Sequence, residues 1–351
     1  MGVLVRELTS LYAAYRRGAA PELPNLPIQY ADYTLWQQSW LQGAALQAQL
    51  DYWRRQLAGL PALNLPTDRP RPAFQSFRGG RQDIVVPQAV TAALNRLSRQ
   101  NDTTLFMTLL AAFATLLHRY SGQDDIAIGS PIANRTRTEL EGLIGFFVNT
   151  LVLRSDLDGD PTFRDALARV REVMFEAHTH QDLPFEQLVE ELQPVRDPSR
   201  NPLFQVMFVL QNTPMSAIEL PELSVRPIIA HNATAKFDLW LGLTEGAQGV
   251  AGGLEYNSDL FDDTTIGRLR SHLLTLLEGI AADPARRLSD LPLLRVAERQ
   301  QLLIEWADTW AAYPHGATLP GLLELQVART PDAVEQREQL AAQPQDGGRV
   351  E

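Results

Sequence analysis

Between residues 82 and 282, short apolar segments typical of strands alternate irregularly with longer segments of helical periodicity. The strand-like segments lie at residues 82–86, 125–132, 147–155, 203–211, 223–229, 237–245 and 250–257. The helical segments lie at residues 88–100, 103–120, 160–178 and 262–282. No regular strand-helix-strand repeat joins these segments, so the order predicts an α/β fold, a mixed two-layer sandwich, in preference to a parallel Rossmann sheet.

Three of these helices carry capping signals. Asp160 and Pro161 predict a helix start, because an N-cap acceptor is followed by proline at the first helical position. Gly122 is the expected C-cap of the helix that ends near residue 120. Asp262 is the expected cap of the last long helix.

The residues before 82 have a different character. Leucine and tyrosine recur at helical spacing from Leu4 to Tyr15, and Gly18 closes this first helix. Residues 30–57 contain an apolar stripe with three tryptophans and predict one or two helices. Residues 63–82 are rich in proline, glycine and arginine, so we expect them to lack regular structure and to bridge two lobes.

Composition excludes several classes of protein. The 42 acidic and 31 basic residues give a net charge of -11, which argues against a general nucleic-acid binder or a basic membrane-surface protein. The chain has no cysteine, so disulfides and thiolate metal sites are excluded and a reducing cytoplasm is the simplest location. The apolar runs are too short to span a bilayer, and the first helix lacks the apolar core of a signal peptide.

Four stretches concentrate aromatic, amide and charged residues: YADYTLWQ (30–37), IGFFVNTLVLR (144–154), HTHQDLPFEQLVEEL (178–192) and RDPSRNPLFQVMF (196–208). The first predicts a helix that packs through its aromatic side chains. In the second, Asn149 stands at the head of an apolar strand, where its amide needs partners. A satisfied amide that orders a turn and a role near a binding tunnel both remain open for Asn149.

The last two stretches favour a rigid loop network over proton transfer. His178 and His180 are two residues apart, so they point in different directions on a helix, and no third ligand stands at a suitable spacing for a metal site. The charged and amide groups beside the prolines suit hydrogen-bonded loops. They are Asp182, Glu186, Arg196, Asp197, Arg200 and Asn201.

One further carboxylate, Asp238, stands in the apolar segment KFDLWLGL. Lys236 is two residues away and would share a face with it in a strand. We therefore expect an ion pair between Asp238 and Lys236.

In their order along the chain, the four stretches resemble the motifs YxDYAxWQ, IGxFVNTxxLR, HxHQDxPFExLV and RDxSRxPLFQVMF of condensation domains in nonribosomal peptide synthetases. The resemblance runs continuously over about residues 1–290. It implies two lobes like chloramphenicol acetyltransferase and an amide-forming acyl transfer between carrier-bound thioesters. It also implies that Asn149 and Asp238 lie near the tunnel between the lobes.

In that family, the general-base motif HHxxxDG directly precedes a helix that resembles MGVLVRELTSLYAAY. The chain has the helix without the motif, and none of its six histidines stands in such a context. We therefore expect no catalytic residue and no condensation activity from this polypeptide alone. Arg135, in SPIANR, is the candidate for the arginine that pairs with the aspartate of HHxxxDG, and its partner would be missing.

The resemblance also divides the chain. Residues 1–77 are expected to be a remnant of the first lobe with the crossover, and residues 78–284 the second lobe. Residues 285–334 resemble the linker and opening of an adenylation domain, and residues 335–351 are expected to be a disordered tail. Both ends thus look cut. The expected partners are carrier domains and the adenylation domain, without nucleic acid or membrane; no cofactor is expected to bind, since phosphopantetheine arms belong to the carriers.

Two alternatives stay open. One is a noncatalytic module that binds carrier proteins through a retained second lobe. The other is a relative of the epimerisation or heterocyclisation type, whose diagnostic motifs would lie upstream of Met1.

Overall fold

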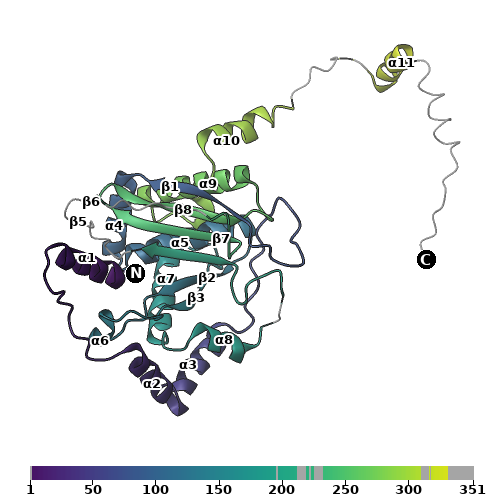
Figure 1. The fold of residues 1–351 in the computed structure, drawn as a ribbon. Coiled ribbons are helices and arrows are strands. Elements are labelled where there is room, and N and C mark those ends of the chain that lie inside the picture. The colour runs from purple at the N-terminus through teal and green to yellow at the C-terminus, as the bar shows by residue number, and fades with distance from the viewer. Residues whose placement is uncertain are drawn as a thin grey trace. The chain divides into compact units, whose positions relative to one another are not determined.

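A six-stranded mixed sheet forms the centre of the computed structural model, which describes residues 2–194, 197–211, 219–220, 223–224, 232–309, 316 and 318–330. Its order is β1-β8-β7-β4-β2-β3 (Figure 1). The strands are β1 (Gly79–Val86), β2 (Asp125–Ile132), β3 (Asn149–Asp156), β4 (Val206–Gln211), β7 (Leu239–Gly246) and β8 (Gly249–Asn257). Strand β4 runs parallel to both of its neighbours, whereas the other adjacent pairs are antiparallel. The mixed α/β fold is confirmed.

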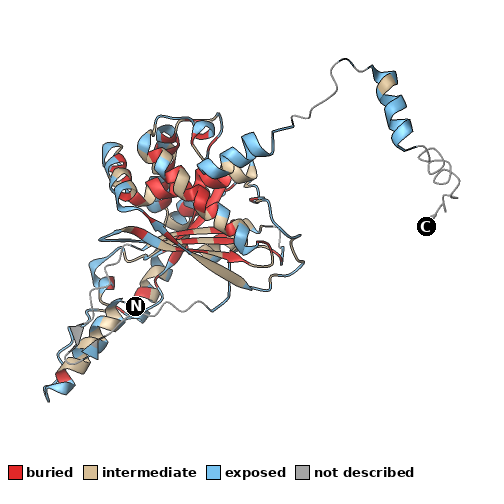
Figure 2. Cartoon of the chain, turned by 90° about the horizontal axis from the view of Figure 1, so that it is seen from above, coloured by how far each residue is buried: buried red, intermediate tan, exposed pale blue. Residues whose placement is uncertain are grey.

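Four long helices pack on one face of the sheet. Figure 2 shows their buried sides turned toward the strands. They are α4 (Gln88–Gln100), α5 (Leu105–Ser121), α7 (Phe163–Thr179) and α9 (Asp263–Ala282). Helix α5 is apolar around most of its circumference, so it lies at the centre of this layer and contacts α4, α7, α9 and β2.

Other helices of the chain lie outside this layer. They are α1 (Gly2–Arg16), α2 (Tyr30–Trp40), α3 (Gly43–Gln56), α6 (Thr138–Glu141), α8 (Phe185–Leu192) and the 3-10 turn η1 (Leu288–Asp290). Two helices, α2 and α3, account for residues 30–57, since a turn at Leu41 and Gln42 separates them. Helix α3 packs on α8, and its Trp53 belongs to the main apolar core.

The structure separates residues 1–295 from residues 296–351 as two units. The second unit contains α10 (Val296–Gln300), the π-helical turn η2 (Gln301–Glu305) and α11 (Leu319–Arg329), whose described side chains include no buried one. A two-stranded ribbon, β5 (Glu219–Leu220) and β6 (Leu223–Ser224), completes the described elements. The division at residues 78, 285 and 335 stays a prediction, and residues 335–351 lie outside the described residues.

Several boundaries differ from expectation for identifiable reasons. The segment 203–211 becomes a strand only at Val206, because Leu203 has a positive φ of 67° and begins a turn. Residues 79–82, expected to be irregular, belong to β1. Of the expected strand 223–229, only Leu223–Ser224 is seen, and the remainder lies outside the described residues.

Two of the three capping predictions also need correction. Thr162, and not Asp160, is the N-cap of α7, because its hydroxyl and Asp165 form a capping box. Asp160 accepts instead from the backbone N–H and hydroxyl of Ser289. Asp262 is the N-cap residue of α9 but makes no side-chain capping bond, whereas Gly122 is a left-handed C-cap as expected.

Strand β2, which lies between β4 and the edge strand β3, offers a test of this packing. A Cβ at Gly129 would overlap the ring of Phe204, so we expect Gly129→Ala to destabilise the chain by about 1–3 kcal/mol. Gly267 is the control, since it lies within α9 and a Cβ there would only touch the Gln82 side chain at 3.5 Å. Gly267→Ala should stabilise the chain by about 0.5–1 kcal/mol. Denaturant unfolding of both variants measures the difference, and equal effects would contradict this packing.

Candidate functional site

The sequence-predicted site residues fall into two groups that different elements position. Arg135, Asn149, His180 and Asp182 belong to the region where α2, α3 and the loops before β3 and α8 come together. Asp197, Arg200, Asn201 and Asp238 lie at the ends of β4 and β7, beside the irregular segment 64–78. Arg196 lies outside the described residues.

Asn149 satisfies all the hydrogen-bonding capacity of its amide. Its Nδ2 group donates to the carbonyls of Gln181 and Leu183 at 2.9 and 2.8 Å. Its Oδ1 atom accepts from the backbone N–H groups of Thr150 and Phe185 at 2.8 and 2.9 Å. The side chain therefore ties the FVNT strand to the loop of HQDLPFE, as the structural alternative predicted.

Arg135 lies in the loop after β2 and satisfies carbonyl groups of its own neighbourhood. Its guanidinium donates to the carbonyls of Leu140 and Leu143, the latter at 2.9 Å. The guanidinium also lies over the ring of Phe147, 4.3 Å from the centroid. We had expected Arg135 to lack its partner, but its guanidinium has these contacts. Burial lowers the pKa of the guanidinium. Its pairing with the aspartate of HHxxxDG stays a prediction.

An aromatic cluster surrounds Phe147. Tyr30 and Tyr33 of α2 contact it, with ring centroids 5.1 and 4.9 Å apart. The Tyr30 hydroxyl donates to the carbonyl of Phe146 at 2.8 Å. The motif YADYTLWQ therefore packs against the motif IGFFVNTLVLR, which confirms that its aromatic side chains have a packing role.

Asp182 lacks such partners. No hydrogen bond or ion pair reaches its half-buried carboxylate from any residue that the structure describes. Burial raises the pKa of this carboxyl group, and the positive charge of Arg137 partly opposes the rise. Arg137 is itself held over the ring of Trp36, 4.5 Å from the centroid. A half-buried carboxylate that is compensated only in part costs stability at neutral pH.

His180 joins the end of α7 to α3. Its ring stacks on Tyr52, with centroids 4.0 Å apart, and its backbone carbonyl accepts from the indole N–H of Trp53 at 2.9 Å. The Nδ1 atom lies 2.8 Å from the carbonyl oxygen of Glu176. The Tyr52 hydroxyl has no partner among the described residues, and burial, with a smaller effect of Glu176, raises its pKa to about 12.

Asp238 is paired, but with a different residue from the expected one. Arg71 donates from Nη1 to Oδ1 of Asp238 at 2.9 Å and from Nη2 to Oδ2. Its Nη1 atom also donates to the carbonyl of Ser199 at 3.2 Å. The predicted pair with Lys236 is wrong because β7 begins at Leu239, so residues 236–238 do not alternate as in a strand. The carbonyl of Lys236 accepts instead from Asn201 at 2.6 Å.

The RDPSRNP loop is held by local bonds. The carboxylate of Asp197 accepts from the backbone N–H and hydroxyl of Ser199, and these bonds lower its pKa. Arg200 lies 3.6 Å from Asp197 and 3.4 Å from the amide oxygen of Asn64. These contacts support the expected rigid network.

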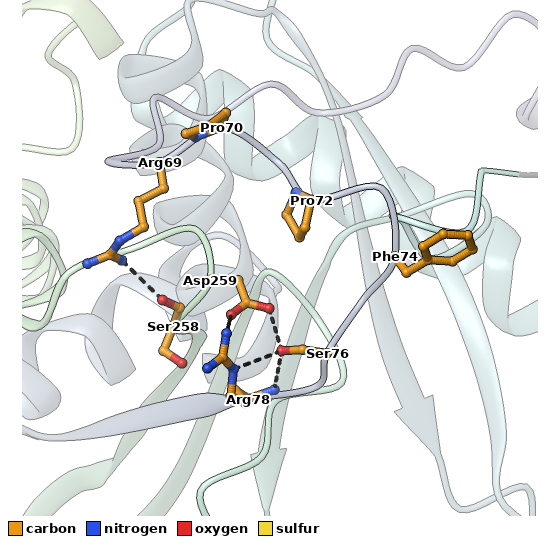
Figure 3. Close-up of a pocket in the computed structure, with 8 residues that line it drawn as sticks. All are labelled: Arg69, Pro70, Pro72, Phe74, Ser76, Arg78, Ser258 and Asp259. Atoms are coloured by element: carbon orange, nitrogen blue, oxygen red, sulfur yellow. Dashed lines mark hydrogen bonds and ion pairs between the residues drawn. The ribbon is translucent and has the colours of Figure 1, made fainter.

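We name residues 64–78 the strap. Beneath it lies a cavity of about 630 Å³ (Figure 3). The cavity is lined by Arg69, Pro70, Pro72, Phe74, Ser76, Arg78, Ser258 and Asp259. Each of its two guanidinium groups already faces a carboxylate, Arg69 that of Asp262 and Arg78 that of Asp259.

The sequence did not single out Arg71 or Arg154. Arg154 pairs with Asp125 and donates to the carbonyls of Gln56 and Ala58, so it fixes the end of α3 on the sheet. The signal for Arg71 was its position between two prolines, where a charged side chain has a fixed backbone to project from.

The side chains of three described histidines, His118, His180 and His272, contact neighbouring groups of the fold. His118 Nδ1 lies 2.9 Å from the carbonyl oxygen of Gln123, and His272 Nδ1 lies 2.6 Å from the hydroxyl of Tyr120. His178 is exposed, while His231 and His315 lie outside the described residues. Within the described ranges, no group of three or more possible metal ligands is found. No helix there is long and apolar enough to cross a membrane.

The profile of the condensation-domain family matches residues 1–303. The chain belongs to this family. Its relatives include a component of linear gramicidin synthase from Brevibacillus parabrevis, 52% identical over 312 residues, which are 88% of this chain and 4% of the relative. Chondramide synthase from Chondromyces crocatus is 45% identical over 334 residues, 95% of this chain and 8% of the relative. The chain thus spans a small fraction of the synthetases that it matches.

Solved structures agree. The X-domain from teicoplanin biosynthesis has a TM-score of 0.76 and 37% identity, covering 84% of this chain and 68% of that one. A four-domain nonribosomal peptide synthetase bound to AMP and glycine has a TM-score of 0.80 and 25% identity, covering 94% of this chain and 26% of that one. The expected resemblance to condensation domains is confirmed.

Asn149 offers a direct test of the site. Asn149→Ala leaves the N–H of Phe185 and the carbonyls of Gln181 and Leu183 without their side-chain partner, so we expect a loss of about 2–4 kcal/mol. Asn95→Ala is the control, because it removes a single exposed bond to Glu245 and should cost less than about 0.5 kcal/mol. Comparable losses in denaturant unfolding would argue against the amide's role.

Asp182 predicts a pH dependence. Because its pKa is raised in the folded chain, the protonated carboxyl favours folding at low pH, and this contribution is lost as pH rises through the raised pKa. Asp182→Asn should therefore stabilise the chain at pH 7, and the gain should shrink as pH falls through that raised value.

Asp165→Asn is the matched control for Asp182→Asn. The pKa of Asp165 is lowered, first by its bond from the Thr162 hydroxyl, so this variant should lose stability at neutral pH and less in acid. Thermal unfolding between pH 4 and pH 7.5 measures both. If Asp182→Asn were destabilising throughout that range, our account of its carboxylate would be wrong.

Proposed function

We propose that this chain provides the second lobe of a peptide-bond-forming condensation domain and forms no peptide bond by itself. Its family membership and mixed α/β fold support the first part. The observation that carries the second part is that none of its six histidines stands in a HHxxxDG motif.

Peptide-bond formation explains why a general base, such as a histidine of the HHxxxDG motif, is needed. An acceptor amine attacks a donor thioester only when it is unprotonated, and the tetrahedral intermediate needs hydrogen-bond donors aimed at its oxygen. The imidazoles of His118 and His272 are already engaged, by a backbone carbonyl and a tyrosine hydroxyl. His180 is stacked on Tyr52 and bonded to its own helix. These contacts favour a structural role for the three histidines over a role as general base.

The motif residues then have a positioning role. Asn149 fixes the loop before α8 against β3, and Arg71 joins Asp238 to the RDPSRNP loop. Rigid loops of this kind hold a shared surface in one shape. We propose that this surface meets carrier domains, whose phosphopantetheine arms carry the substrates, next to an adenylation domain. The absence of cysteine suits a cytoplasmic setting.

A noncatalytic carrier-binding module is the second candidate, and one observation favours it. Ile144, Phe146 and Val148 alternate along the segment before β3 and are 54%, 75% and 52% exposed. Large apolar side chains gathered on a surface commonly mark a protein contact. A carrier-binding module should bind a carrier domain with measurable affinity, whereas an inert fragment should not.

The decisive experiment mixes the chain with aminoacyl-loaded donor and acceptor carrier domains. We expect no dipeptidyl product above the uncatalysed level, whereas a complete condensation domain that contains HHxxxDG should form it. Product that disappears when one of the six histidines is changed to alanine would overturn the proposal.

The same carriers answer the second question. Fluorescence anisotropy of a labelled holo-carrier with the wild-type chain and with Phe146→Ser measures binding to the exposed segment. Saturable binding that Phe146→Ser weakens would favour the carrier-binding module.

A further inference from the structure

The strap is held to the rest of the chain mainly by polar contacts. All of residues 64–78 are described, and no side chain among them is fully buried. The strap contains Pro66, Pro70 and Pro72, which remove backbone donors and leave it without helix or strand. Elements with few apolar contacts are those that open locally below the free energy of global unfolding.

The outer attachments of the strap face solvent. The side chains of Arg69 and Asp262 are 47% and 49% exposed, and that of Arg78 is 75% exposed, although its partner Asp259 is only 10% exposed. The carboxylate of Asp68 accepts from the N–H of Asp262, which is the main reason for its lowered pKa. The ion pair of Arg69 with Asp262, which is exposed on both sides, is screened by water and contributes little.

The contact between Arg71 and Asp238 is different. Their side chains are 18% and 6% exposed, and the guanidinium meets both oxygens of the carboxylate. Such a forked pair fixes orientation as well as distance. Removal of Arg71 would leave a buried carboxylate without a counter-charge, which is strongly unfavourable.

Three segments meet at this pair. Arg71 also donates to the carbonyl of Ser199, and the N–H of Gln75 donates to the carbonyl of Pro198 at 3.3 Å. The N–H of Asp238 donates to the carbonyl of Gln205 at 2.9 Å. The strap, the loop 197–205 and the start of β7 therefore share one buried ion pair.

We propose that the strap opens and closes on the sheet as one unit and that Arg71, through Asp238, is the lock that keeps it closed. The strap connects α3 to β1 along the chain. The cavity in Figure 3 exists only in the closed state, because Pro70, Pro72 and Phe74 form one of its walls. Opening also frees the RDPSRNP loop, which loses its bonds from Arg71 and Gln75.

Hydrogen exchange of the whole chain, read by mass spectrometry, tests the lock. In Arg71→Met, we expect peptides from the strap and the loop 197–205 to exchange roughly tenfold faster or more, with α5 and β2 unchanged. Arg69→Met is the matched control, since it removes an arginine from the same strap but an exposed ion pair. It should change strap exchange by less than about threefold.

A second variant covers the case in which Arg71→Met does not fold. Arg71→Met with Asp238→Leu removes both charges, so it should fold while strap exchange stays fast. The proposal is overturned if Arg69→Met and Arg71→Met act equally. It is also overturned if the double variant keeps the slow exchange of the wild type, or if exchange rises uniformly along the chain.

Discussion

Guanidinium groups that donate to the carbonyls of irregular segments attach the loops of this chain to its sheet and helices. The sheet and its helices complete their own backbone bonds, but the loops between them cannot, and buried carbonyls without donors are costly. Arg71, Arg119, Arg135 and Arg154 each donate to carbonyls of a loop or a helix end. The chain contains a single lysine, Lys236, so nearly all its cations have this planar, multiple-donor geometry.

The same principle places the motif residues. Asn149, at the head of β3, donates to carbonyls of the loop before α8. Arg135 donates to the carbonyl of Leu143, in the loop before β3. Asp182 is the exception, because none of its described neighbours donates a hydrogen bond to its carboxylate. The described motif positions thus combine polar groups that have partners, such as Asn149, with the poorly compensated carboxylate of Asp182, a contrast that stability alone does not explain.

The sequence predicted the elements well because their periodicity is local. The predicted strands and helices between residues 79 and 282 lie within a few residues of expectation, apart from the part of 223–229 that is outside the described residues. Helices α6 and α8 were not predicted, and α8 lies in a stretch that we expected to be a loop network. An amide at the head of an apolar strand demands partners whatever they are, and Asn149 has them, whereas its place near a tunnel stays a prediction. Partners distant in sequence were not predictable. Asp238 was assigned to Lys236 because a strand was assumed to begin earlier, and its true partner is 167 residues away. Capping failed at Asp160 for a related reason, since Thr162 competes locally and Ser289 recruits the aspartate from far along the chain.

The pairing of β1 with β8 has a consequence for synthesis on the ribosome. Gly79 is aligned with Asn257, so the first strand leaves the ribosome about 180 residues before β8, its neighbour among the described strands. At about 5–20 residues per second, β1 waits roughly 10–35 s for its partner. During that interval its backbone donors are unpaired, and Asp83 and Arg81 supply the charges that discourage pairing with another nascent chain.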